Sequence, residues 1–113
     1  MSANAIAQKL DSIQTKGAMR AVDIANLLDA RPETVSRWNK GKAFPREQAL
    51  NILLELEYLV DQLADFYEPN EVRLWMFSRQ RLLDGEKPAE LVKQGKIDKV
   101  MQLVNQLRDG VYI

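Results

Sequence analysis

Residues 21–45 read AVDIANLLDARPETVSRWNKGKAFP, and this stretch decides how the chain folds. Apolar side chains at helical spacing mark a first short helix, and they are Ile24, Ala25, Leu27 and Leu28. A second helix begins at Pro32, because proline fits a first helical turn, where its missing N–H has no partner to lose. This helix ends at Lys40-Gly41. The stretch therefore predicts two short helices joined by Asp29-Ala30-Arg31.

The apolar residues of these two helices have the pattern of a helix-turn-helix. Ala25 is small at the point where the helices must cross closely, and Leu28 and Val35 are apolar where each helix faces a shared core. Trp38 is placed to anchor the end of the second helix. A turn of about three or four residues is the link that such a unit needs. We therefore expect the second helix to lie in the major groove of DNA.

Seven polar residues on and after the second helix are candidate DNA contacts: Glu33, Thr34, Ser36, Arg37, Lys40, Lys42 and Arg46. The first four are expected on the exposed face, where Arg37 can pair with guanine O6 and N7 and Glu33 can accept from cytosine N4. The three later cations suit contacts to phosphate, which set the register without reading sequence.

Charge is distributed unevenly along the chain, although its net charge is zero. Residues 31–46 hold five Lys or Arg against the single carboxylate of Glu33. A basic patch on a neutral protein is typical of a phosphate-binding surface. Taken alone, however, these charges fit a solvated loop at least as well. Only their position beside the predicted helix-turn-helix favours DNA.

The rest of the chain also shows helical periodicity, with no sustained alternation of the kind that predicts strands. We expect further helices around Ile6–Ile13, from Pro45 to about Phe66, after Pro69, after Pro88, and from Ile97 to about Leu107. Gly and Pro at the breaks support these boundaries. Apolar positions in the last 40 or so residues exceed what so small a unit can bury alone, so it must pack on the first module or on another chain.

The 113 residues include no Cys and no His. Disulfides, thiolate metal sites and histidine-based catalysis are thereby excluded, and we expect no enzymatic activity, no cofactor and no metal. Between Glu55 and Glu71 the chain is acidic with no Lys or Arg, and four carboxylates fall on one helical face: Glu57, Asp61, Asp65 and Glu68. They could in principle hold Mg²⁺ or Ca²⁺, but a solvated face is favoured. No apolar run is long enough to span a bilayer and no signal peptide is evident, so a cytoplasmic location is expected.

The run Thr34-Val35-Ser36-Arg37-Trp38, followed by Gly41 and Pro45, resembles the Xre/Cro repressor family over about residues 5–60. Asp29 stands where that family usually has a glycine in the turn. Aspartate tolerates the left-handed backbone better than most residues, so we expect a slightly strained turn and an intact fold.

The second half resembles the C-terminal domain of the Xre/MbcA/ParS antitoxins. The matching residues are Trp75, Leu83-Asp84-Gly85-Glu86-Lys87-Pro88, Leu91, Gly95 and Gly110-Val111-Tyr112. The two resemblances follow one another in the order of that family. They imply an all-α protein in which a Cro/repressor-like helix-turn-helix bundle (residues 1–67) precedes a small helical C-terminal domain (residues 68–113).

This resemblance implies a type II antitoxin that neutralises a RES-domain toxin, which destroys cellular NAD. It also implies repression of the antitoxin's own operon through double-stranded DNA, by a homodimer. The residues carried over as toxin-binding are Arg108, Asp109, Gly110, Val111, Tyr112 and Ile113. From the residues alone, this tail could equally close the protein's own core. A plain helix-turn-helix repressor whose C-terminal helices only dimerise is the alternative function.

Overall fold

The computed structural model describes residues 2–110. In this range the chain forms seven α-helices and one 3₁₀ helix, and no strand. The elements are α1 (Ala3–Gly17), α2 (Ala21–Leu27), α3 (Pro32–Asn39), α4 (Glu47–Leu63), α5 (Pro69–Phe77), η1 (Arg81–Leu83), α6 (Pro88–Lys93) and α7 (Ile97–Arg108). The predicted all-α class is confirmed.

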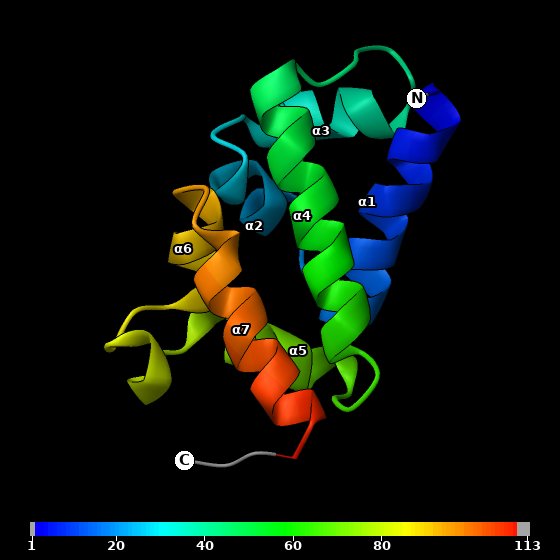
Figure 1. Ribbon diagram of the computed structural model, residues 1–113. Helices are drawn as coiled ribbons and strands as arrows, with labels where there is room; N and C mark the ends of the chain where they lie inside the picture. Colours follow the sequence, from blue (N-terminus) through cyan, green and yellow to red (C-terminus); the bar gives the residue numbers. More distant parts are fainter. Residues whose placement is uncertain (1, 111–113) are drawn as a thin grey trace.

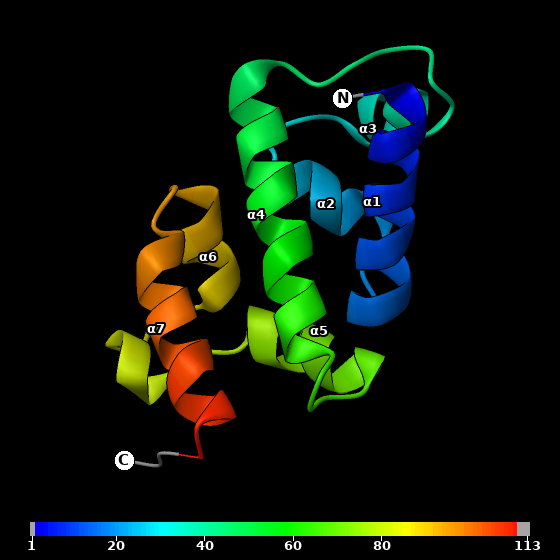
Figure 2. The ribbon, with the colours of Figure 1, turned by 45° about the vertical axis from the view of Figure 1, so that its right-hand side comes forward.

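The longest helix, α4, runs through the middle of the molecule, which measures 46 × 24 × 22 Å (Figure 1). Its most extensive packing is against α1, and the two helices lie side by side in both ribbon views (Figure 2). Helix α1 also packs against α3 and against α5. Helices α6 and α7 cover the side of α4 that faces away from α1. The first helix therefore contacts both halves of the chain.

A single cluster of buried apolar side chains extends from α1 to α7. Helix α4 supplies five of them, among them Leu56 and Leu59, and the C-terminal half adds Val72 and Met76, which are fully buried. The cluster continues past the predicted boundary between residues 67 and 68, which lies in the turn between α4 and α5. No helix among the described residues is both long and apolar enough to cross a membrane.

The close approach of α1 and α4 depends on Gly17, which is buried in the last turn of α1. A Cβ atom at this position would lie 3.3 Å from Cγ1 of Val60. This contact is tighter than the usual van der Waals distance, so a larger residue would push the two helices apart. Ala18, with φ 50°, then ends α1 in the left-handed conformation.

Three of the four acidic residues that the sequence placed on one face of α4 form ion pairs with distant parts of the chain. Lys9 Nζ lies 3.4 Å from Glu57 Oε1, and Lys16 Nζ lies 2.5 Å from Asp61 Oδ1. The hydrogen bond to Asp61 raises the pKa of Lys16. Because α1 supplies both lysines, the face is not the unopposed acidic surface that the sequence suggested.

The other two acidic residues, Asp65 and Glu68, lie beyond the last residue of α4, so the prediction that all four share one helical face is wrong. Arg108 Nη2 lies 3.4 Å from Asp65 Oδ2, which connects α7 to the end of α4. Glu68 precedes α5, and its N–H donates to Glu71 Oε1 at 2.8 Å. The described residues contain no group of three or more acidic, His or Cys side chains arranged to hold a metal ion.

Candidate DNA-binding and partner-binding surfaces

Helices α2 and α3 form the helix-turn-helix that the sequence predicted. The turn is closed by backbone hydrogen bonds, with Leu28 N–H donating to Ile24 O at 3.0 Å and Ala30 N–H donating to Ala25 O at 2.8 Å. Asp29 takes φ 53°, which confirms the expected left-handed backbone at the usual glycine position. Pro32 occupies the first turn of α3, as predicted.

Opposite faces of α3 have different surroundings. Val35 and Trp38 are buried in the shared core, as predicted, which fixes the rotation of the helix about its axis. Of the candidate DNA contacts on α3, Glu33, Ser36 and Arg37 are exposed. The expectation that Thr34 lies on the exposed face is wrong: it is half-buried and lines a groove together with Trp38. The reason is helical geometry, since positions 34 and 38 lie one turn apart on the same side.

Lys40, Lys42 and Arg46 lie on or beside the loop that leads from α3 to α4, and all three are exposed. The loop is fixed to α3 by Lys42 N–H, which donates to Arg37 O at 2.9 Å, while Gly41 takes φ 73°. The three candidate phosphate-binding cations therefore all lie on the segment that leads from the end of α3 to the start of α4.

Two further cations beside the helix-turn-helix stand outside the predicted set of DNA contacts, although Arg31 was counted in the basic patch of residues 31–46. Arg20 and Arg31 are exposed and stand immediately before α2 and α3. The free N–H groups at a helix N-terminus attract phosphate, so an arginine at this position strengthens an anion-binding surface. The signal available in the sequence was the position of each arginine directly before a predicted helix.

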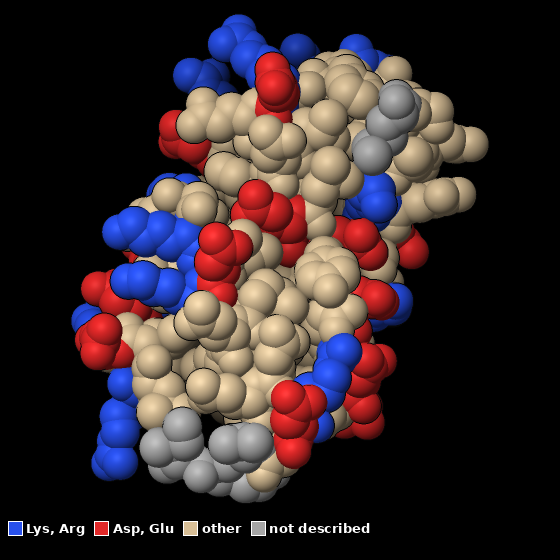
Figure 3. Space-filling model, in the orientation of Figure 1, with Lys and Arg blue, Asp and Glu red and all other residues tan. Residues whose placement is uncertain are grey.

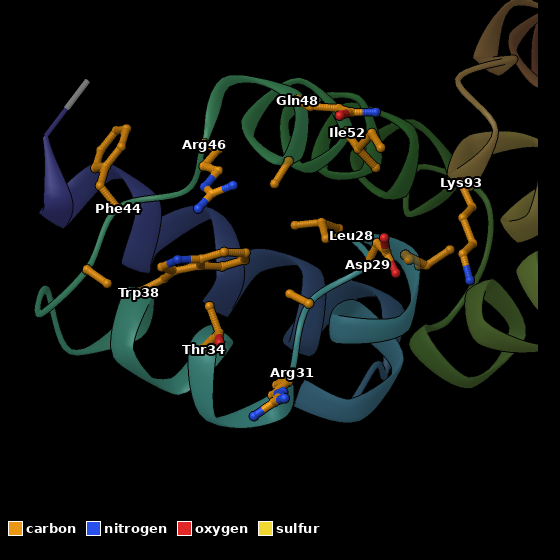
Figure 4. A pocket seen from close by; sticks show the side chains of 14 residues that line it. Leu28, Asp29, Arg31, Thr34, Trp38, Phe44, Arg46, Gln48, Ile52 and Lys93 are labelled. Atoms are coloured by element: carbon orange, nitrogen blue, oxygen red, sulfur yellow. The ribbon is translucent and has the colours of Figure 1, made fainter.

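A groove of about 960 Å³ separates the helix-turn-helix from the N-terminal end of α4 (Figure 4). Its walls come from the α2–α3 turn, α3, the α3–α4 loop and the first turns of α4, and Lys93 reaches it from α6. Trp38 lies along its floor, with Arg46 on one side and Arg31 below. The cationic lining residues are Arg31, Arg46 and Lys93, and the one carboxylate is Asp29.

Charged side chains are spread unevenly over the face of the molecule that Figure 3 shows. Acidic side chains run down its middle, Lys and Arg gather at its upper edge, and the two kinds are mixed along the left and right edges. The upper edge corresponds to the end of the molecule where α3 and the start of α4 lie (Figure 1). A neutral chain thus gathers cations at this end, while along the rest of this face acidic side chains have cations among them.

The candidate toxin-binding segment begins where α7 ends. Arg108 is the last residue of α7, and its Nη2 donates to Gln62 O and to Asp65 Oδ2, each at 3.4 Å. Asp109 caps the helix, and Gly110 follows with φ 71°. The structure therefore fixes the base of the segment against α4. The remaining candidates, Val111, Tyr112 and Ile113, lie outside the described residues.

An ion pair joins the helix-turn-helix to the C-terminal half. Arg73 on α5 donates from Nη1 to Asp23 Oδ2 at 2.5 Å and from Nη2 to Asp23 Oδ1 at 3.3 Å. Its Nη1 also donates to Ala18 O at 3.2 Å, and its guanidinium carbon lies 5.3 Å from the centre of the Phe77 ring. Partial burial alone would raise the pKa of Asp23, but hydrogen bonds from Arg73 and from Arg20 N–H outweigh it and lower the pKa.

Comparison with known proteins agrees with this arrangement. Residues 62–110 match the model of the antitoxin Xre/MbcA/ParS C-terminal toxin-binding domain. The mycobacterial cidal antitoxins MbcA of Mycobacterium bovis and Mycobacterium tuberculosis are each 31% identical over 113 residues, which is 100% of both chains. A probable mycobacterial cidal antitoxin of M. tuberculosis is 28% identical over 104 residues, covering 92% of this chain and 88% of its own.

The match extends to three dimensions. A chain in the crystal structure of the M. tuberculosis MbcT–MbcA toxin–antitoxin complex superposes with a TM-score of 0.87 at 31% identity, covering 96% of this chain and 97% of that one. Identity along the full length and a matching fold together show the family: the chain belongs to the Xre/MbcA/ParS antitoxins.

Proposed function

We propose that this antitoxin neutralises a RES-domain toxin that degrades NAD, and that it represses its own operon by sequence-specific DNA binding. The observation that carries the proposal is the match along the whole chain to an antitoxin whose crystal structure is that of a complex with its toxin. Residues 62–110 also match a domain described as toxin-binding. The antitoxin role rests on these matches. The RES fold of the toxin and its degradation of NAD are proposed from the family resemblance.

The toxin-binding surface of the proposal is the segment Arg108–Ile113. Its base is held by the two hydrogen bonds of Arg108 to α4, so the residues that follow leave the helical body at a defined place. An aromatic side chain close to a chain end is a familiar anchor in protein interfaces. We assign this segment the task of covering the toxin's active-site entrance.

The DNA-binding surface of the proposal is the exposed face of α3 with the cations that follow it. Arg37 and Glu33 are the residues that read base edges, with Ser36 beside them. Lys40, Lys42 and Arg46 contact phosphates, and Thr34 contributes from the groove side. We also propose that the protein acts as a homodimer in the cytoplasm and binds an inverted repeat, because helix-turn-helix dimers read two-fold operators.

Removal of residues 109–113 tests the antitoxin half of the proposal. The truncated chain should keep its melting temperature and its DNA affinity, because the described helices and the Arg108 contacts precede the cut. It should fail to rescue cells that express the adjacent toxin gene. Arg37→Ala is the matched control, which should lose operator binding and retain rescue. A truncated chain that melts several degrees lower and still neutralises the toxin would mean that the tail closes the core of the antitoxin itself.

Arg37→Ala also tests the DNA half, because Arg37 is exposed on the recognition helix. Its affinity for the upstream inverted repeat should fall by about 1–3 kcal/mol, as for loss of a base-reading arginine. Lys40→Ala and Lys42→Ala should weaken binding to every sequence similarly and flatten the salt dependence. Fluorescence anisotropy with labelled duplexes measures both effects. Unchanged affinity in Arg37→Ala would remove the base-reading role. A chain that binds the operator but never rescues from a toxin would instead be a plain repressor.

A further inference from the structure

The cations that line the groove beside the helix-turn-helix come from three separate elements. Arg31 precedes α3, Arg46 precedes α4, and Lys93 is the last residue of α6. In Figure 4 they approach the groove from three sides, with Lys93 extending from α6 toward the end where Asp29 lies. Since Asp29 is the one carboxylate of the lining, the groove carries an excess of positive charge.

None of these three cations forms an ion pair within the part of the chain that the structure describes. The five ion pairs found there use Lys9, Lys16, Arg20, Arg73 and Arg108. Arg31, Arg46 and Lys93 are all exposed and remain free to bind an external anion. A groove with one carboxylate and three such cations favours a ligand with more than one negative charge.

The position of the groove indicates where that anion comes from. Thr34 and Trp38 of α3 line the groove, and Glu33 and Arg37, which we assign to base reading, are their direct neighbours on the same helix. A DNA duplex seated on the exposed face of α3 carries its phosphates past the edges of that helix. A strand of phosphodiesters therefore passes close to the groove as soon as the recognition helix enters the major groove.

We propose that this groove seats the phosphate backbone of the bound DNA, and that Lys93 supplies a phosphate contact from the C-terminal half of the chain. The inference rests on the proposed DNA binding and extends it beyond the helix-turn-helix. Lys93 follows Leu91 and Val92, which are buried in the common core. Helix α6 packs against α2, α4, α5 and α7, so the base of the lysine side chain is held in a fixed place.

This contact gives the C-terminal half two roles. The residues that match the toxin-binding domain, 62–110, include Lys93. The same small unit then touches DNA through α6 and presents the toxin-facing segment at the end of α7. Affinity for DNA then becomes a property of the whole chain.

A salt titration of DNA binding with the full-length protein tests the contact. Lys93→Ala should reduce the slope of log K against log salt by about 0.9, the value for one phosphate contact on duplex DNA, and should weaken operator and unrelated duplexes by the same factor. Lys93→Arg keeps the charge and should preserve the slope. Lys87→Ala is the matched control: Lys87 is exposed, precedes the same helix and does not line the groove, so its slope should equal that of the unmodified protein.

The outcomes separate this inference from the proposed function. If Arg37→Ala weakens operator binding while Lys93→Ala leaves the slope unchanged, the inference fails and DNA binding stands. If the unmodified protein binds no DNA, both fail. Thermal unfolding with added pyrophosphate tests whether the groove binds a free phosphate-containing anion instead of DNA. Stabilisation by pyrophosphate that is lost in Lys93→Ala, together with an unchanged DNA slope, would make the groove a site for a free anion and overturn the inference.

Discussion

Replacing Arg73 with methionine should weaken the connection between the helix-turn-helix and the C-terminal half. The guanidinium of Arg73 makes three hydrogen bonds, two to the carboxylate of Asp23 and one to Ala18 O. Methionine keeps an unbranched chain about as long as Arg73 up to Nε, which limits the loss of packing, although it gives up the contact of the guanidinium with the Phe77 ring. The substitution therefore removes the charge and the hydrogen bonds while it keeps the unbranched stem of the side chain.

The magnitude follows from the exposure of the pair. A hydrogen bond to a charged group contributes about 1.5–3 kcal/mol when it is well shielded, and an exposed ion pair about 0–1 kcal/mol. The side chains of Arg73 and Asp23 are 32% and 12% exposed, which lies between these cases. We expect Arg73→Met to lower the free energy of unfolding by about 1–2 kcal/mol at neutral pH.

The loss should depend on pH, and its sign follows from Asp23. The pKa of this carboxyl is lowered in the folded protein, because its hydrogen bonds and the charge of Arg73 outweigh the effect of partial burial. A lowered pKa stabilises the folded state above the unfolded value of about 3.9, and this contribution disappears as the pH falls through the folded value. The stability difference between the unmodified protein and Arg73→Met should be complete at neutral pH and should narrow below about pH 4.

Urea unfolding followed by circular dichroism, at neutral and at acid pH, measures these differences. A double-mutant cycle with Asp23→Asn measures the interaction energy of the pair. The double mutant should lose less stability than the two single losses added together, because either single change already breaks the ion pair. Arg81→Met is the control, since Arg81 is exposed and forms none of the side-chain ion pairs found in residues 2–110. Two results would refute the reasoning. One is that the stability losses of Arg73→Met and Asp23→Asn simply add in the double mutant. The other is that the stability difference between the unmodified protein and Arg73→Met stays the same at pH values where Asp23 is protonated.

Three further predictions concern packing and charge. Trp38→Ala and Trp75→Ala should each lower the free energy of unfolding by about 3–5 kcal/mol, because both indoles are buried; urea unfolding measures the loss, and solvent-exposed tryptophan emission in the native state would contradict it. Gly17→Val should cost about 1–3 kcal/mol in the same assay by crowding Val60, and Val60→Ala in the same chain should recover part of that loss. Millimolar Mg²⁺ or Ca²⁺ should leave the melting temperature unchanged, since Glu57, Asp61 and Asp65 are each paired with a cation; a rise would indicate a metal site.

The helix-turn-helix was predictable because its determinants are local. Pro32 sets the start of α3, and Asp29 accepts the left-handed backbone that the turn requires. Val35 and Trp38 then fix the buried side of the helix through their spacing. Each of these effects acts within a few residues. Residue type and spacing were sufficient to state those of Pro32, Val35 and Trp38, and the resemblance to the Xre/Cro family indicated that of Asp29.

Contacts between distant segments were not predictable in the same way. Lys9 and Glu57 are 48 positions apart, and Asp23 and Arg73 are 50 apart. The acidic face of α4 looked unopposed because its cations come from α1 and α7, and which helix lies beside α4 depends on how the whole core packs. The position of Lys93 beside the α2–α3 turn was not predictable for the same reason. It depends on how α6 packs in the folded chain, and the residues next to Lys93 in the sequence give no sign of it.

The common core makes the two halves depend on each other. Val72 and Met76 are fully buried although they belong to the half that carries the toxin-binding match, and α5, which holds them, packs on α1. A unit of about 40 residues cannot bury enough apolar surface to be stable alone. The surface that α5–α7 present to a partner therefore exists only while α1 and α4 are folded. Because α1 also packs on α3, the orientation of α3 and the position of α5 are set by the same helix.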